Sequence, residues 1–202
     1  CRAYLGCGGS QPSTDSAVRD TQGTVLTHAG RIVPTVFSAN CGGWTENNET
    51  VWSGPANPVL RGVPDLPGNA GRAGGTGSIR DWLLKPPRAY CSVNPDSFRW
   101  KKRLTTAELT ALVNKRHAVG TVRSVEPGSR GVSGRLKSVT VSGSKKTEVI
   151  TKELNIRLAF GGLPSAMFVV ESEGPPGRPT GFVFTGGGRG HGVGLCQDGA
   201  RG

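Results

Sequence analysis

A glycine-rich segment, residues 186–202, presents one histidine and one glutamine. His191 lies between two glycines, and Gln197 follows six residues later. Glycine permits φ > 0 and close approach of other groups to the backbone, so we expect these side chains to project from an immobilised turn into a groove. There the imidazole could hydrogen-bond a sugar, carry a proton or bind a metal. Two alternatives stay open: a histidine that bonds backbone in a tight turn, and a flexible glycine-rich tail.

A second polar cluster surrounds Gly42 and Gly43. Trp44 lies within it, Trp52 follows shortly after, and its short polar residues are Asn40, Thr45, Glu46 and Asn47. An aromatic face beside amide, hydroxyl and carboxylate groups suits a carbohydrate, because the ring covers C–H groups while the polar atoms bond hydroxyls. These residues and Trp44 are therefore candidate substrate-binding residues. The alternative is a self-satisfied polar turn with the tryptophans in the core.

The cysteines carry a further set of hypotheses. Five occur, at positions 1, 7, 41, 91 and 196, without a C-x-x-C pair. Wide spacing in a basic, Gly/Pro-rich chain favours an exported protein with disulfides, and the odd count leaves one thiol over. A disulfide between Cys41 and Cys196, or from either to Cys91, would join the two polar clusters. Cys1 and Cys7 could bridge locally or bind a metal with a histidine, so zinc at a Cys/His site is the one alternative to a protein without cofactor.

Composition limits the class of partner. The 202 residues carry a formal net charge of +11, with 32 Gly and 14 Pro. This charge predicts an anionic neighbourhood such as an acidic polymer or lipid headgroups. No run of Lys and Arg resembles a nucleic-acid-binding arm, so nucleic acid is not expected as a partner. No apolar run is long enough to span a membrane. Without an initiator methionine or signal peptide, the chain is expected to be a processed or partial piece.

The pattern of apolar and turn residues predicts the elements that position these side chains. It indicates an α+β fold with mostly antiparallel strands, a few short helices and glycine-rich loops that form a groove. The clearest helix is 105–113, where a threonine cap, Glu108 and an i, i+3, i+4 apolar face coincide. A second helix is expected at 152–160, and residues 53–119 form an irregular excursion around the first. The expected strands are 24–27, 31–38, 120–125, 136–141, 147–150, 165–171 and 182–185.

Two glycine motifs and several landmarks occur in order along the chain. The motifs read Gly188-Arg-Gly-His-Gly-Val-Gly-Leu-Cys-Gln-Asp-Gly-Ala200 and Ser38-Ala-Asn-Cys-Gly-Gly-Trp-Thr-Glu-Asn47, the second followed by Val51-Trp52. Together they resemble the SpoIID/LytB domain of bacterial cell-wall proteins over nearly the whole chain. Further stretches that carry the resemblance are 17–26, 134–135, 156–157 and 163–168. It implies one SpoIID/LytB-like domain over 1–202, incomplete at both ends.

The resemblance implies two functions from different classes. Family members that act as peptidoglycan lytic transglycosylases protonate the glycosidic oxygen with one glutamate, in a segment that this chain lacks. Glu46 is the one acid within a motif that could replace it, although the resemblance gives it a binding role. Asp198 and Ser38 also depart from the family pattern. The enzyme hypothesis thus requires an upstream glutamate.

The second hypothesis is a module that binds glycan strands without cleaving them, or enhances a cell-wall amidase. A third is a structural subunit of an envelope assembly. In all three the protein is exported to the bacterial cell envelope, periplasmic or extracellular, with peptidoglycan glycan strands as the expected partner.

Overall fold

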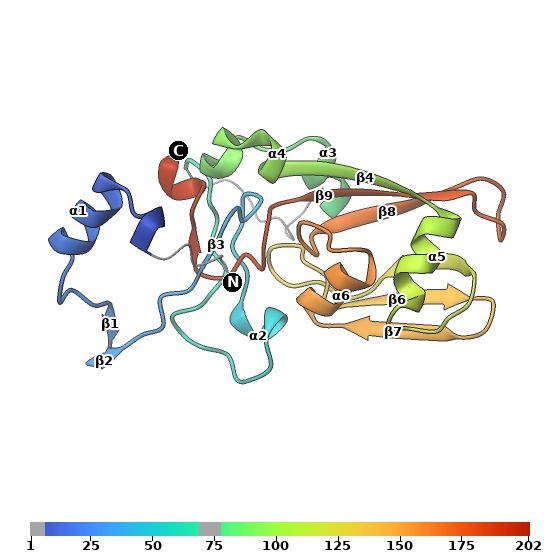
Figure 1. Cartoon of the computed structure of the whole chain (residues 1–202), viewed down its shortest axis with the longest axis horizontal. Coiled ribbons are helices and arrows are strands. Elements are labelled where there is room, and N and C mark those ends of the chain that lie inside the picture. Colours follow the sequence, from blue (N-terminus) through green and yellow to red (C-terminus); the bar gives the residue numbers. More distant parts are fainter. Residues whose placement is uncertain (1–6, 69–77) are drawn as a thin grey trace. The chain divides into compact units, whose positions relative to one another are not determined.

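The computed structural model describes residues 7–68 and 78–202. The chain divides into two compact units, Cys1–Thr35 and Val36–Gly202. Figure 1 labels the elements of both units, and each unit is described by itself.

Unit 1 contains a helix and a short hairpin. After the 3₁₀ turn η1 (Cys7–Gly9), α1 (Pro12–Asp20) begins at a proline, whose fixed φ suits the first helical turn. Strands β1 (Thr27–His28) and β2 (Arg31–Ile32) pair antiparallel across Ala29 and Gly30, both at positive φ, so the expected hairpin is confirmed. The strand expected over 31–38 is interrupted, because Pro34 cannot donate to a ladder. None of residues 8–35 is buried.

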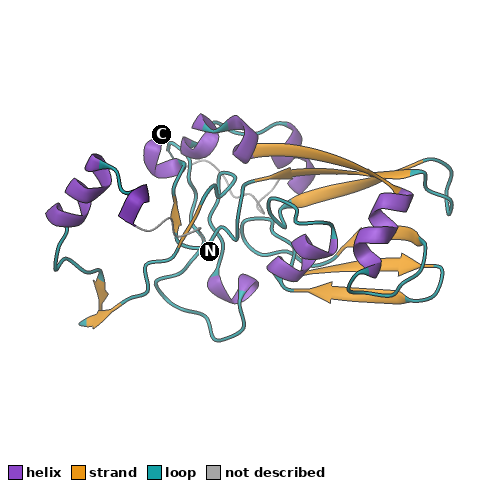
Figure 2. Cartoon of the chain, viewed as in Figure 1, coloured by secondary structure: helices purple, strands orange, loops and turns teal. Residues whose placement is uncertain are grey.

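Unit 2 is built on two three-stranded antiparallel sheets, drawn in orange in Figure 2. One has the order β4-β9-β8 and the other β5-β6-β7. The strands are β4 (Arg99–Thr105), β5 (Val122–Pro127), β6 (Ser138–Gly143), β7 (Thr147–Thr151), β8 (Phe168–Glu173) and β9 (Gly181–Gly187). The expected α+β class with mostly antiparallel strands is confirmed.

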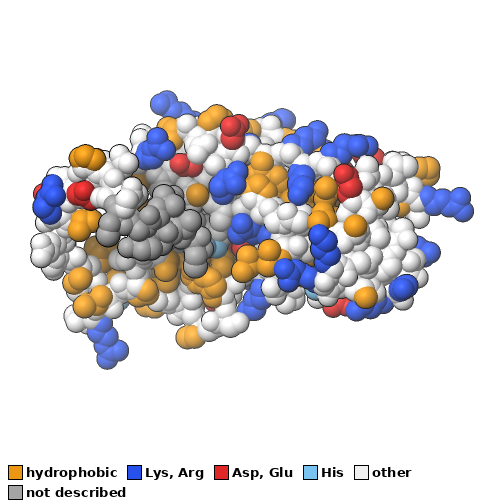
Figure 3. All heavy atoms as spheres, in the orientation of Figure 1, with side chains coloured by type: hydrophobic (Ala, Val, Ile, Leu, Met, Phe, Trp, Pro, Cys, Tyr) orange, Lys and Arg blue, Asp and Glu red, His pale blue; other side chains and the backbone are white. Residues whose placement is uncertain are grey.

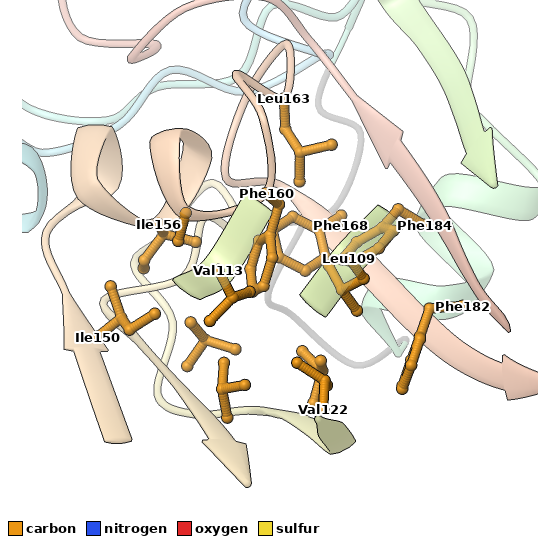
Figure 4. Close-up of a cluster of buried hydrophobic side chains, with 14 of the residues drawn as sticks. Leu109, Val113, Val122, Ile150, Ile156, Phe160, Leu163, Phe168, Phe182 and Phe184 are labelled. Carbon is orange, nitrogen blue, oxygen red and sulfur yellow. The ribbon is translucent and has the colours of Figure 1, made fainter. Parts of the chain in front are cut away.

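Helices α5 (Thr106–Asn114) and α6 (Glu153–Ala159) contribute to the core between these sheets. Thr105 caps α5 as predicted: its hydroxyl accepts from Glu108 N–H at 3.2 Å, and the Glu108 carboxylate accepts from Thr105 N–H at 2.8 Å. Figure 4 shows how aromatic and aliphatic side chains from both sheets and both helices meet. The labelled members are Leu109, Val113, Val122, Ile150, Ile156, Phe160, Leu163, Phe168, Phe182 and Phe184.

The remaining elements of unit 2 are short. They are β3 (Phe37–Ser38), α2 (Asn48–Val51), α3 (Ile79–Leu84), η2 (Tyr90–Val93), α4 (Pro95–Phe98), β10 (Leu195–Cys196) and η3 (Gly199–Arg201). Most contribute to or flank a second core, while Val51 of α2 belongs to a small third one. Strands β3 and β10 form a parallel pair in which Cys196 lies opposite Ser38. This pairing brings the end of the chain beside the loop that follows β3. The stretch 53–119 therefore holds α3, η2, α4 and β4 besides the expected helix, while 69–77 lie outside the described residues.

Candidate metal centre

Three cysteines from distant parts of the sequence meet in the second core of unit 2. Cys41 follows β3, Cys91 lies in η2, and Cys196 ends β10. Cys41 and Cys91 have no exposed surface, and Cys196 is 4% exposed. All three are free thiols, so the structure joins the two polar clusters through a thiol cluster instead of the expected disulfide.

Asp65 completes a four-membered group. One ligand atom from each of Cys41, Asp65, Cys91 and Cys196 can be chosen so that all four lie within 4.8 Å of one another. Backbone bonds fix Asp65 in place: its N–H donates to the Gly43 carbonyl, and its own carbonyl accepts from Tyr90 N–H, both at 3.0 Å. Sequence reasoning missed Asp65, because it stands alone in a proline-rich stretch at no recognisable ligand spacing.

The distances suit a tetrahedral metal ion. The Cys41 and Cys91 sulfur atoms are 3.7 Å apart, and Cys41 Sγ lies 3.2 Å from Asp65 Oδ2. Zinc–sulfur bonds of about 2.3 Å at tetrahedral angles separate two sulfur atoms by about 3.8 Å. Three thiolates and a carboxylate would fill four positions and leave none open for a substrate, as in structural zinc sites.

Hydrogen bonds distribute charge unevenly within the cluster. Cys196 Sγ accepts from the backbone N–H groups of Cys41 at 3.1 Å and Gly199 at 3.4 Å. Hydrogen bonds from the Cys41 and Cys91 thiols, together with these N–H groups, hold the pKa of Cys196 well below its ordinary value. The same bonding to Cys196 raises the pKa of Cys41 and of Cys91, and burial raises the pKa of Asp65. These shifts favour the deprotonated form at Cys196 over that at Cys41 and Cys91.

A half-buried cation and a set of apolar side chains lie beside the cluster. Arg99 donates to the carbonyls of Gly42, Phe98 and Trp82, and its Nε atom is buried without a hydrogen-bond partner. Burial lowers the pKa of Arg99 to about 10, and Cys91 and Cys41 oppose that change when they lose their protons. Leu66, Ala89, Phe98 and Trp82 provide the apolar contacts. A guanidinium and an apolar shell of this kind favour a charged ligand set from which water is excluded.

Asn40, a predicted substrate-binding residue, is buried beside this cluster. Its amide donates to the Cys91 carbonyl at 2.9 Å and to Asp198 at 3.0 Å, and its carbonyl oxygen accepts from Gly42 N–H at 2.9 Å. Asn40 therefore connects the three segments that carry the cysteines. Asp198, noted as a departure from the SpoIID/LytB pattern, is the partner that the asparagine requires here.

The other residues of the 40–47 cluster hold loops together. Glu46 has no exposed surface; its carboxylate accepts from Asn47 N–H, Val132 N–H and the Ser133 hydroxyl, the last at 2.7 Å. Thr45 and Val63 are joined by three hydrogen bonds, and Asn47 Oδ1 accepts from Gly62 N–H at 2.7 Å. Trp44 is buried, and its Nε1 atom has no hydrogen-bond partner among the described residues. Contact of any of these residues with a ligand stays a prediction.

His191 lies in a loop that a buried arginine organises. Its Nδ1 atom accepts from Val193 N–H at 3.0 Å, and its ring centroid is 4.9 Å from that of Trp52. Burial, then the charge of Arg135, lowers the pKa of His191 to about 4, so the imidazole is neutral at physiological pH. Arg135 has no exposed surface and donates to the carbonyls of Cys41 and Gly190. Half-buried Gln197 donates its backbone N–H to the Ser38 carbonyl at 3.0 Å.

The sequence also predicted a metal site formed by Cys1 and Cys7 with a histidine. Cys1 lies outside the described residues, so this site stays a prediction. Among the described residues, the group that could bind zinc is the cluster of Cys41, Asp65, Cys91 and Cys196. This cluster contains no histidine, unlike the predicted Cys/His site.

Comparison with known proteins assigns the family. Residues 46–194 match the model of a domain of unknown function, DUF8618, and the chain belongs to that family. It is also 30% identical over 192 residues to an uncharacterized protein of Brachyspira hyodysenteriae (strain ATCC 49526 / WA1), covering 94% of this chain and 43% of that protein. The chain thus spans less than half the length of this relative.

The SpoIID/LytB assignment is wrong, since the matching family is DUF8618 and no SpoIID/LytB match was found. The two glycine motifs are short and rich in residues that any tight, closely packed loop requires, which is why they suggested another family.

Among residues 7–68 and 78–202, no helix is both long and apolar enough to cross a membrane. The basic side chains on the face drawn in Figure 3 are spread out and do not form one stripe.

Proposed function

We propose that this chain binds one zinc ion through Cys41, Asp65, Cys91 and Cys196, and that the metal holds the ends of three loops together. The observation that carries the proposal is the convergence of four ligand atoms within 4.8 Å in a buried site. Thiolates select soft and borderline metals, and a tetrahedral set of three sulfur atoms and one oxygen suits zinc better than magnesium or calcium.

Metal content and affinity provide the test. The chain is purified under reducing conditions, stripped with chelator and titrated with Zn²⁺ and Co²⁺. We expect one equivalent bound, thiolate-to-cobalt charge-transfer absorption, and affinity that falls with acid because Cys41 and Cys91 must lose protons. Cys91→Ser is expected to abolish stoichiometric binding, and Asp65→Asn to weaken it. Asp96→Asn, with the same charge change on an exposed residue, is the matched control.

Less than a tenth of an equivalent of metal after reduction and reconstitution would refute the zinc proposal. Equal binding by the wild-type chain and Cys91→Ser would also refute it, because the ion would then be held elsewhere.

A second proposed function is carbohydrate binding beside α2. The supporting observation is Trp52, a residue that is 39% exposed and whose ring centroid lies 4.9 Å from that of His191. Glu49 lies one helical turn away and forms a half-exposed ion pair with Arg61. An accessible indole could cover the C–H face of a sugar while the carboxylate and guanidinium bond its hydroxyls. Glycan of an exported cell envelope stays the proposed source of that sugar.

Binding to peptide-free glycan strands in a sedimentation assay tests this second function. Trp52→Ala is expected to reduce binding about tenfold, while Trp52→Phe retains most of it. Unchanged binding in Trp52→Ala would contradict the proposed sugar site. Glycan cleavage was expected only from the SpoIID/LytB resemblance and has lost that basis; it remains untested.

A further inference from the structure

A cavity lies at one end of unit 2, away from the cysteine cluster. Its volume is about 420 Å³, and it is bounded by the start of α5, the start of β5, the β6–β7 turn and the β8–β9 turn. In Figure 1 the β8–β9 turn and α5 are drawn at the opposite end of the unit from β10, which carries Cys196. The lining residues are Thr106, Thr121, Val122, Arg123, Ser144, Gly177, Arg178 and Pro179.

Two arginines of this lining keep their hydrogen-bond donors available. Within the described part of the chain, the exposed guanidinium groups of Arg123 and Arg178 make neither an ion pair nor a hydrogen bond, and no carboxylate lines the cavity. Arg103, in β4, is instead paired with Glu173 at 2.7 Å. The cavity therefore carries two positive charges without a counter-ion from the protein.

The hydroxyl groups of the lining add further donors. Ser144 Oγ accepts from Thr121 N–H at 3.0 Å, which leaves its own hydrogen available, and no bond occupies the Thr121 hydroxyl. The remaining hydroxyl, on Thr106, donates to the Pro179 carbonyl. That bond ties the β8–β9 turn to α5, as does the bond from Thr106 N–H to the Thr180 carbonyl at 3.1 Å. Arg178, in the β8–β9 turn, and Arg123, in β5, therefore line the same cavity although their segments belong to different sheets.

We propose that this cavity binds a phosphate group, with Arg123 and Arg178 as the charged partners and the Thr121 and Ser144 hydroxyls as neutral donors. Guanidinium groups bond phosphate oxygens in pairs, and a lining that offers donors and no carboxylate is complementary to an oxyanion. The volume exceeds that of a lone phosphate, so it also accommodates a phosphate monoester or the phosphodiester of a polymer. The site is independent of the zinc and sugar sites.

Amide chemical shifts of the full chain measure this binding. Titration with inorganic phosphate is expected to shift the amides of Thr121, Ser144 and Gly177 saturably. The double variant Arg123→Gln/Arg178→Gln is expected to bind at least about tenfold more weakly. The control is the double variant Arg88→Gln/Arg116→Gln, which makes the same change in charge at two exposed arginines outside the cavity. A parallel titration with a poly(glycerol phosphate) chain, compared with glycerol 1-phosphate, distinguishes a polymer from a free phosphate ester.

The site is supported if any of these ligands causes saturable shifts that the Arg123/Arg178 double variant loses and the control variant keeps. The ligand that binds most tightly then shows whether the phosphate belongs to a polymer or to a small molecule. Absence of saturable shifts with all three would overturn it. An equal loss in the control variant would also overturn it, because binding would then reflect net charge alone. The replaced side chains are exposed, and circular dichroism of both variants verifies that they fold.

Discussion

His191 illustrates how the fold alters the chemistry of a single residue. Sequence reasoning gave it three functions: sugar donor, proton carrier and metal ligand. In the structure its Nδ1 atom already accepts a backbone N–H, and the lowered pKa keeps the ring neutral. The nearby Arg135 guanidinium has no exposed surface and opposes a second positive charge. A positively charged His191 is therefore disfavoured in the native state.

This pKa predicts a pH dependence of stability. A histidine with a pKa of about 4 when folded and about 6.5 when unfolded binds more protons in the unfolded state between these values, so the free energy of unfolding falls as the pH falls. By pH 5 we expect a loss of about 2 kcal/mol relative to pH 7.5. Urea unfolding at both pH values measures it. His191→Gln is expected to flatten the profile between pH 6.5 and 5; an equally steep profile in that variant would assign the titration to another group.

The loop from Gly188 to Gly194 depends on backbone shapes and contacts that only glycine allows. Gly192 has φ +79°, and a Cβ atom there would overlap the Arg135 guanidinium. Arg135 in turn fixes the loop through its bonds to Gly190 and Cys41. At the scale of the element, loop and buried arginine therefore form one packed unit, which rules out the flexible glycine-rich tail as an interpretation of 188–194.

A pair of glycine variants separates backbone strain from this close contact. Gly162 shares the positive φ, at +76°, but a Cβ there would meet no atom within 4 Å. We expect Gly162→Ala to lower the free energy of unfolding by about 1 kcal/mol and Gly192→Ala by about 3 kcal/mol or more. Denaturant unfolding gives both values. Similar losses in the two variants would show that Arg135 moves aside easily and does not constrain the loop.

At the scale of the whole molecule, unit 2 contains the buried cores while residues 8–35 contain no buried residue. The cysteine cluster, the phosphate cavity and Trp52 all belong to unit 2. We therefore expect residues 36–202 to fold and to provide the proposed zinc site, because the described part of unit 1 contributes no core of its own.

A truncated chain, 36–202, tests this division. We expect it to fold, to bind one zinc ion, and to unfold with a Tm within roughly 4 °C of the full chain, which corresponds to a change of about 1 kcal/mol. Calorimetry with and without Zn²⁺ supplies the comparison. Failure of the truncated chain to fold, or a much larger fall in Tm, would show that unit 1 completes the core.

The sequence by itself determined the local structure. A threonine N-cap at 105 or 106 and the first-turn acid Glu108 predicted α5, and alternating valines predicted β5 and β6. Caps and side-chain periodicity act over a few neighbouring residues, so the sequence alone reveals them. It also located the cysteines and the two glycine motifs. It did not identify the family, since such motifs describe tight loops as well as ancestry.

Only the tertiary structure decided the site. Cys41, Cys91 and Cys196 lie far apart in the chain, and the parallel pairing of β3 with β10 brings the last of them beside the first. Asp65 joins them through two backbone bonds that no local pattern encodes. Glu46 and Asn40, which the sequence presented as ligand contacts, bond buried loops instead of facing solvent. Burial and long-range pairing depend on the whole fold, so they fixed which polar residues meet and which become part of the core.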